Sequence, residues 1–412
     1  MEKIQKQFKD AATFEQNEKW QNCIERIRPL SHKPFDIRSE FDRDATRILH
    51  SSAYRRLKHK TQVFFATNND HVCTRIEHVN HVASISKTIS TALGLNTALS
   101  EAIALGHDLG HSPFGHHGEK IIEKIMEKQG FKTKFWHEKN SLRFVDYIET
   151  LPNYTGFKDN LNLTYAVRDG IVCHCGEVNE NKIKPRSEYI DLETIEKGKY
   201  MPYTYEGCVV KIADKIAYLG RDIEDAYHYR FFEKKDLLTL KQIAQELMQK
   251  KIRFKDVNTS SLIHEFIINL CKNSNTDEGL VLSKEHYEMM KKVKKFNYQK
   301  IYSNKRFHFF MDYAALVINS IFDFLLSYYD SFNTINRLHK YVKYYPTMCV
   351  DFSDWLIKYS NIDEKQHFMR KYQNVIIYDI QNEMDYKQAI IDYISGMSDN
   401  YAIKAYNELI EF

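Results

Sequence analysis

The sequence has 412 residues, with 59 Lys and Arg against 55 Asp and Glu, and a formal net charge of +4. A chain of this length allows about two or three domains, or one large domain with additions, and is ample for a sizeable core. With 43% apolar and 28% charged residues, the composition excludes a disordered, collagen-like or low-complexity protein. The near-zero net charge gives no support to a nucleic-acid-binding function, although a small net charge still allows a local basic patch.

Glycine and proline are scarce. The chain has 14 Gly and 7 Pro, whereas average usage of about 7% and 5% would give roughly 29 and 21. Because both residues punctuate turns and break helices, the low counts predict long helices and few tight hairpins. Five of the 14 glycines fall between Gly94 and Gly118, which marks that stretch as unusual.

The seven cysteines are scattered, and only Cys173 and Cys175 lie close together. A C-x-C pair alone is a poor zinc signature, so we expect reduced, buried thiols in a cytoplasmic protein. The N-terminal residues lack the apolar stretch of a signal peptide. The most apolar long run, residues 311–329, carries polar interruptions at helical spacing, which predicts an amphipathic helix of a soluble protein and not a membrane span.

The predicted elements are helices. A leader, residues 1–35, contains one helix that ends near Pro29 and Pro34, and apolar residues at helical spacing predict the next helix from Arg38 to about Leu57. Six more helices are predicted in the order Arg75–Leu93 with Gly94 as its C-cap, Thr97–Asp108, Glu119–Lys128, His137–Glu149, Leu163–Val172 and Glu206–Tyr229.

After residue 230, amphipathic segments rich in Lys and Glu continue to the C-terminus, with polar breaks near 273–277 and 361–364. Strand-like alternation is rare, and no repeat or Gly/Ser linker is found. The simplest organisation is therefore one mainly helical, all-α unit, with a leader (1–35), a core (36–230) and a C-terminal helical region (231–412).

Histidines are concentrated in one part of the chain. Eight of the 18 lie at positions 71, 78, 81, 107, 111, 116, 117 and 137. Clustered histidines indicate a metal site or an acid–base site, although a single histidine is more often structural. The argument therefore depends on their arrangement.

His107 and Asp108 are the first candidate metal ligands. Adjacent side chains on a helix point about 100° apart, so two neighbours can hold one ion only at a helix end or with help from another element. The following Gly-containing turn ends the helix there. Imidazole and carboxylate together suit Mn, Fe, Co, Zn or Mg. His78 is a candidate third ligand, because consecutive helices with short connections pack as antiparallel neighbours.

The fourth ligand should be a carboxylate, and the predicted helix 206–229 offers a polar face. At 100° per residue, its members fall within about 120° of one another: they are Lys211, Asp214, Lys215, Tyr218, Arg221, Asp222 and Asp225. From this helix alone, an ordinary solvated surface is the favoured interpretation. The mixture of anions, cations and a tyrosine is also what a pocket for a metal, a polyphosphate and a nucleoside requires.

Several stretches around these residues resemble the HD-superfamily deoxynucleoside triphosphate triphosphohydrolases, the dGTPase-like family. They are TRIEHVNHV, EAIALGHDLGHSPFGHHGE, FWHEKNSLRFV and ADKIAYLGRDIEDA, with RDATRILHSSAYRRLKHKTQVF upstream and IDYISGMSDNYA near the C-terminus. The resemblance covers about residues 36–402. It implies an HD-domain helical core with a C-terminal helical extension, in a cytoplasmic homo-oligomer that hydrolyses dNTPs, dGTP first, to deoxynucleoside and tripolyphosphate.

The resemblance also implies the roles of individual residues. His78, His107, Asp108 and Asp214 would hold one divalent ion (Mg, Mn, Co, Fe or Zn), which positions the α-phosphate and activates the attacking water. His116 would be the general acid with Glu119 orienting it, His111 would lie near the α-phosphate, and His137 and Glu138 would form a further polar pair.

For the substrate, the resemblance implies that Arg75 and Lys215 contact phosphates and that Gln62 and Asp222 recognise the 3′-hydroxyl. Tyr218 would pack under the sugar and exclude a 2′-hydroxyl. Without the resemblance, an ordinary solvated helix face would be the preferred interpretation of the two cations. The sequence departs from the family pattern at Ser112, where proline is common, and at His81, where glutamate is common. His174 is interpreted as a packed histidine.

Two rival functions remain open at this stage. One is an HD phosphohydrolase acting on a nucleoside monophosphate or a guanosine polyphosphate, against which Tyr218 and Asp222 argue. The other is an HD-derived protein with a structural metal that binds single-stranded nucleic acid through the basic segment 43–60. That role has no need of the His111, His116 and Glu119 set.

Overall fold

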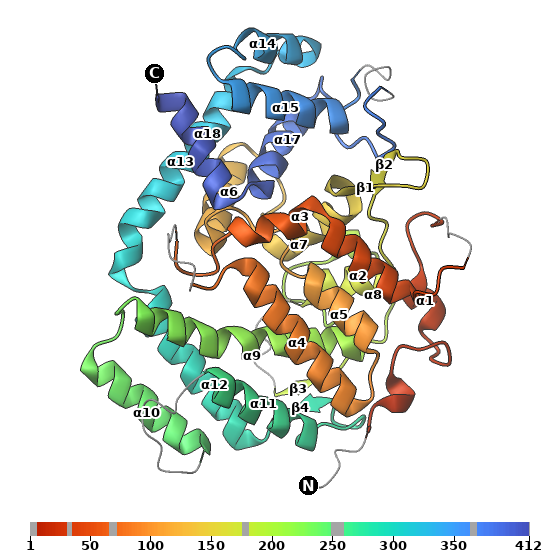
Figure 1. The fold of residues 1–412 in the computed structure, drawn as a ribbon, viewed down its shortest axis with the longest axis vertical. Coiled ribbons are helices and arrows are strands. Elements are labelled where there is room, and N and C mark those ends of the chain that lie inside the picture. Colours follow the sequence, from red (N-terminus) through yellow and green to blue (C-terminus); the bar gives the residue numbers. More distant parts are fainter. Residues whose placement is uncertain are drawn as a thin grey trace.

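The computed structural model describes residues 6–30, 35–65, 72–174, 181–248, 259–362 and 369–411. Helices are the main elements of the described chain, which confirms the all-α prediction (Figure 1). Two small antiparallel sheets accompany them, β1 (Thr150–Pro152) with β2 (Lys158–Asn160), and β3 (Lys182–Ile183) with β4 (Leu280–Val281). Pro34, His71, Cys175 and part of the predicted break at 361–364 lie outside the described residues.

The N-terminal half contains the predicted helices with small differences in their bounds. They are η1 (Lys9–Ala11), α1 (Trp20–Ile24), α2 (Glu40–His50), α3 (Ser52–Arg56), η2 (Leu57–His59), α4 (Arg75–Leu93), α5 (Thr97–Gly106), α6 (Gly115–Lys128), α7 (His137–Arg143), η3 (Phe144–Ile148), α8 (Tyr165–Cys173), η4 (Leu192–Thr194) and α9 (Tyr205–His228). The predicted helix 38–57 is divided at Ser51, whose backbone is extended and whose hydroxyl accepts from the N–H of Tyr54 to cap α3. Gly94, at φ +82°, ends α4 as predicted.

The C-terminal half lies in two groups of helices joined by α13. The elements are α10 (Lys234–Met248), α11 (Thr259–Asn273), α12 (Lys284–Asn297), η6 (Tyr298–Tyr302), η7 (Lys305–Phe307), α13 (His308–Ser327), η8 (Ser331–Asn333), α14 (Thr334–Lys340), α15 (Pro346–Tyr359), α17 (Glu383–Gly396) and α18 (Asp399–Ile410). Figure 1 shows α13 along one side of the molecule, running from the group of α10–α12 to that of α14–α18. The division into a core and a C-terminal region at residue 230 stays a prediction.

The helix α13 is the most apolar long helix. The stretch Lys305–Ser327 is long and apolar enough to cross a membrane by length and composition alone, a test that core helices of soluble proteins also pass. Six of its side chains are buried, and the helix packs against α6, α17 and α18. Phe309 and Leu316 are exposed. The absence of a membrane span stays an expectation.

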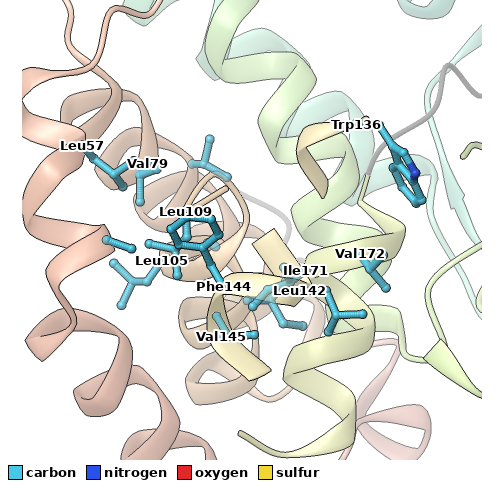
Figure 2. Packing of buried hydrophobic residues seen from close by; sticks show 14 of the residues in the cluster. Leu57, Val79, Leu105, Leu109, Trp136, Leu142, Phe144, Val145, Ile171 and Val172 are labelled. Carbon is cyan, nitrogen blue, oxygen red and sulfur yellow. The ribbon is translucent and has the colours of Figure 1, made fainter. Parts of the chain in front are cut away.

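The helices α4, α5 and α9 form the centre of the N-terminal half, and each packs against the other two. Figure 2 shows the apolar side chains that hold this region together, among them Val79 of α4, Leu105 of α5 and Leu109 just after it. Leu105 and Leu109 are buried on either side of His107 and Asp108. The dipeptide is therefore fixed between two apolar anchors at the point where α5 ends.

The interpretation of the polar face of α9 as an ordinary solvated surface is wrong. Lys211 is 2% exposed, Asp222 3% and Asp225 6%. The cause is packing, because α4, α5, α8 and α11 all contact α9 and cover it on several sides. Buried charged side chains need polar or charged partners, so we expect this face of α9 to contact such groups inside the protein.

Candidate active site

The four predicted metal ligands meet at one point. His78 Nε2, from α4, lies 3.0 Å from Asp214 Oδ1, from α9. His107 Nε2, at the end of α5, lies 4.0 Å from the same oxygen and 3.6 Å from Asp108 Oδ1. The consecutive helices α4 and α5 and the distant helix α9 therefore bring two imidazoles and two carboxylates together.

His107 is oriented for a ligand. Its Nδ1 lies 2.6 Å from the carbonyl oxygen of Ala104, so the ring takes the tautomer that donates from Nδ1 and leaves a lone pair on Nε2. That Nε2 is buried and has no hydrogen-bond partner among the described residues. An orphaned nitrogen in a group of nitrogen and oxygen donors is the chemistry of a divalent-cation site, so these residues fit the implied metal.

The charge states of His78 and Asp214 depend on each other. Burial alone would lower the pKa of His78, but the bond to the Asp214 carboxylate raises it. Burial alone would raise the pKa of Asp214, but the bond from His78 and the nearby His107 hold it below its ordinary value. Asp214 is therefore an anion at neutral pH, available to a cation in place of His78.

Arg75 is buried behind the metal ligands. Its Nη1 donates to Asp108 Oδ2 at 2.7 Å, and its side chain is 2% exposed, so the interpretation as a solvated residue is wrong for Arg75. Burial alone would raise the pKa of Asp108, but His107, His111 and Arg75 hold it well below its ordinary value. The remaining guanidinium nitrogens of Arg75, Nε and Nη2, are buried without a partner in the described chain. They are donors left for an anion.

A second cluster contains the predicted catalytic residues. Glu119 Oε2 lies 3.4 Å from His116 Nδ1 and 3.1 Å from His137 Nδ1. The rings of His111 and His137 stack at 3.7 Å between centroids. His111 Nε2 is also 3.3 Å from Asp108 Oδ1, which joins this cluster to the metal ligands. Glu138 adjoins it, with Oε1 3.2 Å from His137 Nε2.

The environments of these histidines differ. Burial, with the nearby charge of Arg75, holds the pKa of His111 well below its ordinary value, so its imidazole is neutral. The side chain of His116 is 69% exposed and faces solvent. Burial alone would lower the pKa of His137, but Glu138 and Glu119 raise it. The three rings therefore differ in environment: His111 is buried and neutral, His116 is accessible to solvent, and His137 lies between two carboxylates.

The turn between α5 and α6, which contains Gly110 and Phe114, is closely packed. A Cβ at Gly110 would overlap the backbone of Ser141, whose hydroxyl accepts from the N–H of Gly110 and donates to the carbonyl of His107. Phe114 has a positive φ of 65°, a conformation that costs a non-glycine residue energy. This turn is therefore closely packed and strained.

The C-terminal helices clamp that turn, which sequence reasoning did not foresee. Asp399, at the start of α18, accepts from the N–H of Phe114 at 2.9 Å and from the N–H of Thr61 at 3.0 Å, and also from the Thr61 hydroxyl. The buried Lys60 Nζ donates to the carbonyl oxygens of His111 and Ser395. The only signal was that these residues fall in the two terminal stretches of the family resemblance.

The predicted substrate residues lie around the clusters, except for one. Asp222 is buried, accepts from the Tyr302 hydroxyl, and has its pKa raised by burial to about 7. Tyr218 is half-buried between Asp214 and Asp222 on α9. Gln62 lies beside the turn, where its backbone carbonyl oxygen is close to the position that a Cβ at Gly115 would take. Lys215 instead lines a small cavity with apolar residues of α11, α12, β3 and β4.

Two further contacts come from residues without a sequence signal. Tyr302 reaches Asp222 from η6, and Lys197 Nζ lies 3.3 Å from Glu119 Oε1. Both residues are remote in sequence from their partners and belong to no recognised stretch. The roles of all the predicted site residues stay predictions.

Comparisons with known proteins identify the family of the chain. Residues 75–219 match the HD domain, and residues 359–408 match a phosphohydrolase-associated domain. Three relatives are deoxyguanosinetriphosphate triphosphohydrolase-like proteins. The one from Caldanaerobacter subterraneus is 34% identical and that from Clostridium tetani 32%, each over 93% of this chain and 88% of the relative. The one from Rickettsia bellii is 31% identical over 91% of this chain and 93% of the relative. The chain therefore belongs to the deoxyguanosinetriphosphate triphosphohydrolase-like family of HD-domain phosphohydrolases.

Proposed function

We propose that this phosphohydrolase converts deoxynucleoside triphosphates, dGTP first among them, to deoxynucleosides and tripolyphosphate. The observation that carries the proposal is the junction of the two clusters, where Asp108 contacts both His107 and His111. In this proposal, buried cation ligands adjoin proton-transfer groups of which one, His116, reaches solvent. The names of the relatives support the choice of substrate.

In this proposal, His78, His107, Asp108 and Asp214 hold one divalent ion, which supplies Lewis-acid stabilisation of phosphate charge and lowers the pKa of bound water. The O and N donors are compatible with Mg, Mn, Co, Fe or Zn. Arg75 fixes the orientation of Asp108 and directs its free N–H groups at phosphate oxygens. The strongly anionic triphosphate is thereby neutralised within a buried site.

Proton transfer falls to His116. The 5′-oxygen of the departing deoxynucleoside must gain a proton, and an exposed imidazole beside the Glu119 carboxylate can give one and be reprotonated from solvent. His111 is buried and neutral, so it serves as a hydrogen-bonding group near the α-phosphate. His137 and Lys197 share the Glu119 carboxylate and hold it in place.

Sugar recognition is assigned to α9. The Asp222 carboxylate accepts the 3′-hydroxyl, with Gln62 as a second polar contact, and the half-buried Tyr218 excludes a 2′-hydroxyl. Lys215 is kept as a phosphate contact, although its cavity-lining position makes it the least central of the set. A cytoplasmic location and a homo-oligomeric state belong to the same proposal.

The test is product analysis. The full chain is incubated with each dNTP and each NTP in Mg²⁺, Mn²⁺ or Co²⁺, and the products are separated by ion-exchange chromatography. Tripolyphosphate with an equal amount of deoxynucleoside is expected. Pyrophosphate or orthophosphate as the first product would instead support a different nucleotide phosphohydrolase.

Matched variants sharpen this assay. Tyr218→Ala is expected to admit ribonucleotides, because it removes the ring that excludes the 2′-hydroxyl. Tyr227→Ala changes a tyrosine on the same helix that is 53% exposed, and it should leave the dNTP preference unchanged. Metal binding without hydrolysis, together with salt-sensitive binding of single-stranded oligonucleotides, would support a nucleic-acid-binding protein.

A further inference from the structure

His117 has no part in the proposed function, although it directly follows the proposed general acid His116 in α6. Its ring centroid lies 5.9 Å from that of Phe307 in η7 and 6.0 Å from that of Phe310 in α13. The side chain is half-buried, and burial lowers its pKa to about 4, so the imidazole is uncharged. Because neighbouring side chains on a helix point about 100° apart, His117 contacts this aromatic region while His116 faces Glu119.

The aromatic region adjoins both residues that the proposed function assigns to the 3′-hydroxyl. Its rings pack against one another and are called the Phe64 cluster: Phe64, Tyr229, Phe231, Tyr302, Phe307 and Phe310. The Phe64 ring is central, 5.2 Å from the Tyr229 ring and 5.9 Å from the Phe307 ring, between centroids. Gln62 lies two residues before Phe64, and the Tyr302 hydroxyl donates to Asp222. The sugar end of the proposed site is therefore continuous with this cluster.

Several polar atoms beside the Phe64 cluster lack partners. His117 Nδ1 and the Tyr229 hydroxyl are buried without a hydrogen-bond partner among the described residues, as is Gln62 Oε1. Buried polar atoms are bonded in the large majority of cases, so these orphaned atoms indicate a ligand. At the metal end of the site, His107 Nε2 and two guanidinium nitrogens of Arg75 are orphaned in the same way within the described chain. Orphaned atoms therefore occur at both ends of the proposed substrate site.

The chemistry of the orphaned atoms differs between the two ends. A cation and phosphates suit the end at His107 and Arg75, whereas the Phe64 cluster offers uncharged polar atoms among aromatic rings. A nucleobase is a planar ring that packs against aromatic side chains and carries donors and acceptors on its edge. Half-buried rings leave part of the cluster accessible to such a ligand; they are those of Tyr229, Tyr302 and Phe310. The base of a nucleotide whose sugar lies at Gln62 and Asp222 can therefore pack here.

We propose that His117 recognises the nucleobase of the substrate, with its Nδ1 bonded to the edge of the base while the base packs against the Phe64 cluster. This inference rests on the proposed function, which supplies the position of the sugar. An uncharged imidazole nitrogen either donates or accepts, so it distinguishes bases with a keto oxygen from bases with an amino group at the same position. The dGTP preference suggested by the names of the relatives requires Nδ1 to donate. Guanine O6 accepts such a bond, whereas the N6 amino group of adenine is itself a donor.

The substitution His117→Phe separates recognition from packing, because it keeps a ring against Phe307 and Phe310 and removes both nitrogens. The full chain is given dGTP and dATP together in Mn²⁺, and the loss of each nucleotide is followed by chromatography. The ratio of the two kcat/KM values is measured within one sample, so it does not depend on the fraction of the variant that is folded. The ratio of dGTP to dATP is expected to fall at least about tenfold, as the loss of one discriminating hydrogen bond implies.

Two further variants and a binding measurement complete the test. His117→Asn places an amide N–H near the position of the imidazole Nδ1–H, so it should restore part of the ratio. His308→Phe is the matched control, because His308 is an exposed histidine at the start of α13, and it should keep the wild-type ratio. Equilibrium dialysis of dGTP and of dATP against the metal-free protein makes the same comparison without hydrolysis.

Two results would overturn the proposal. A wild-type ratio of dGTP to dATP in His117→Phe, in turnover or in dialysis, would show that His117 is only a packing residue. A wild-type protein that treats the two nucleotides alike would also refute it. Release of pyrophosphate or orthophosphate, together with a base preference that depends on His117, would instead overturn the proposed function and support base recognition.

Discussion

Replacement of Asp399 by alanine tests whether the C-terminal helices hold the catalytic turn in place. Asp399 is 3% exposed, and its two carboxylate oxygens accept from the backbone N–H groups of Phe114 and Thr61. Asp399→Ala would leave the N–H of the buried Phe114 and the N–H of the partly buried Thr61 without an acceptor, at about 1–3 kcal/mol for each group. We therefore expect the free energy of unfolding to fall by about 2–5 kcal/mol.

The same change should reduce activity beyond its effect on stability. Phe114 keeps a φ of 65° only while its surroundings enforce it, and a strained residue of this kind stores about 1–3 kcal/mol. Release of the turn would move His111 and His116, which flank it in sequence. Because 1.4 kcal/mol corresponds to a factor of about ten, we expect kcat/KM to fall at least about tenfold under conditions where the variant is folded.

The assay combines urea unfolding with tripolyphosphate release. Asp399→Asn keeps one acceptor oxygen, so its loss of stability should be about half as large. Asn382→Ala is the matched control, because it removes the cap that accepts from the N–H of Met384 at the start of α17 without touching the turn. It should lose about 1 kcal/mol of stability and keep its activity. The reasoning is refuted if Asp399→Ala unfolds at the wild-type urea concentration, or if it loses stability no differently from Asn382→Ala and retains full turnover.

Three further outcomes follow from the site. Asp214→Asn should abolish turnover at low metal concentration while the fold, measured by circular dichroism, is retained, and wild-type activity of the variant at the same low metal concentration would contradict its role as a ligand. Arg75→Met should weaken Mn²⁺ binding by about 10–100-fold in a calorimetric titration, because Asp108 loses the partner that orients it; unchanged affinity would show that the pair is only structural. The raised pKa of Asp222, about 7 against an ordinary 3.8, means that the folded state holds a proton which the unfolded state releases, so its contribution to stability is lost as the pH rises from about 4 to about 7. Asp222→Asn should therefore gain urea resistance relative to the wild type over that interval, and parallel curves would show that Asp222 is not protonated in the folded protein.

The sequence by itself determined the helical fold and the identity of the candidate donors. The bounds of α4 and its Gly94 cap followed from periodicity and from the need for a residue that tolerates positive φ. His107 and Asp108 stood out because two adjacent donors at a helix end have few other uses. Such features are local, since a few neighbouring residues specify them, and a single chain therefore displays them directly.

Only the tertiary structure decided what surrounds those donors. Spacing along α9 could not reveal that its polar face is buried, because burial depends on helices that lie elsewhere in the chain. Lys197, Tyr302 and Asp399 contact the site from distant positions, and no local pattern marks a residue whose partner lies far away in sequence. The same holds for His117, which is only one of several clustered histidines until the fold brings it against Phe307 and Phe310. The sequence states which side chains are present. Packing over the whole chain decides which neighbours each side chain has, and those neighbours determine its charge state, its orientation and the groups it binds.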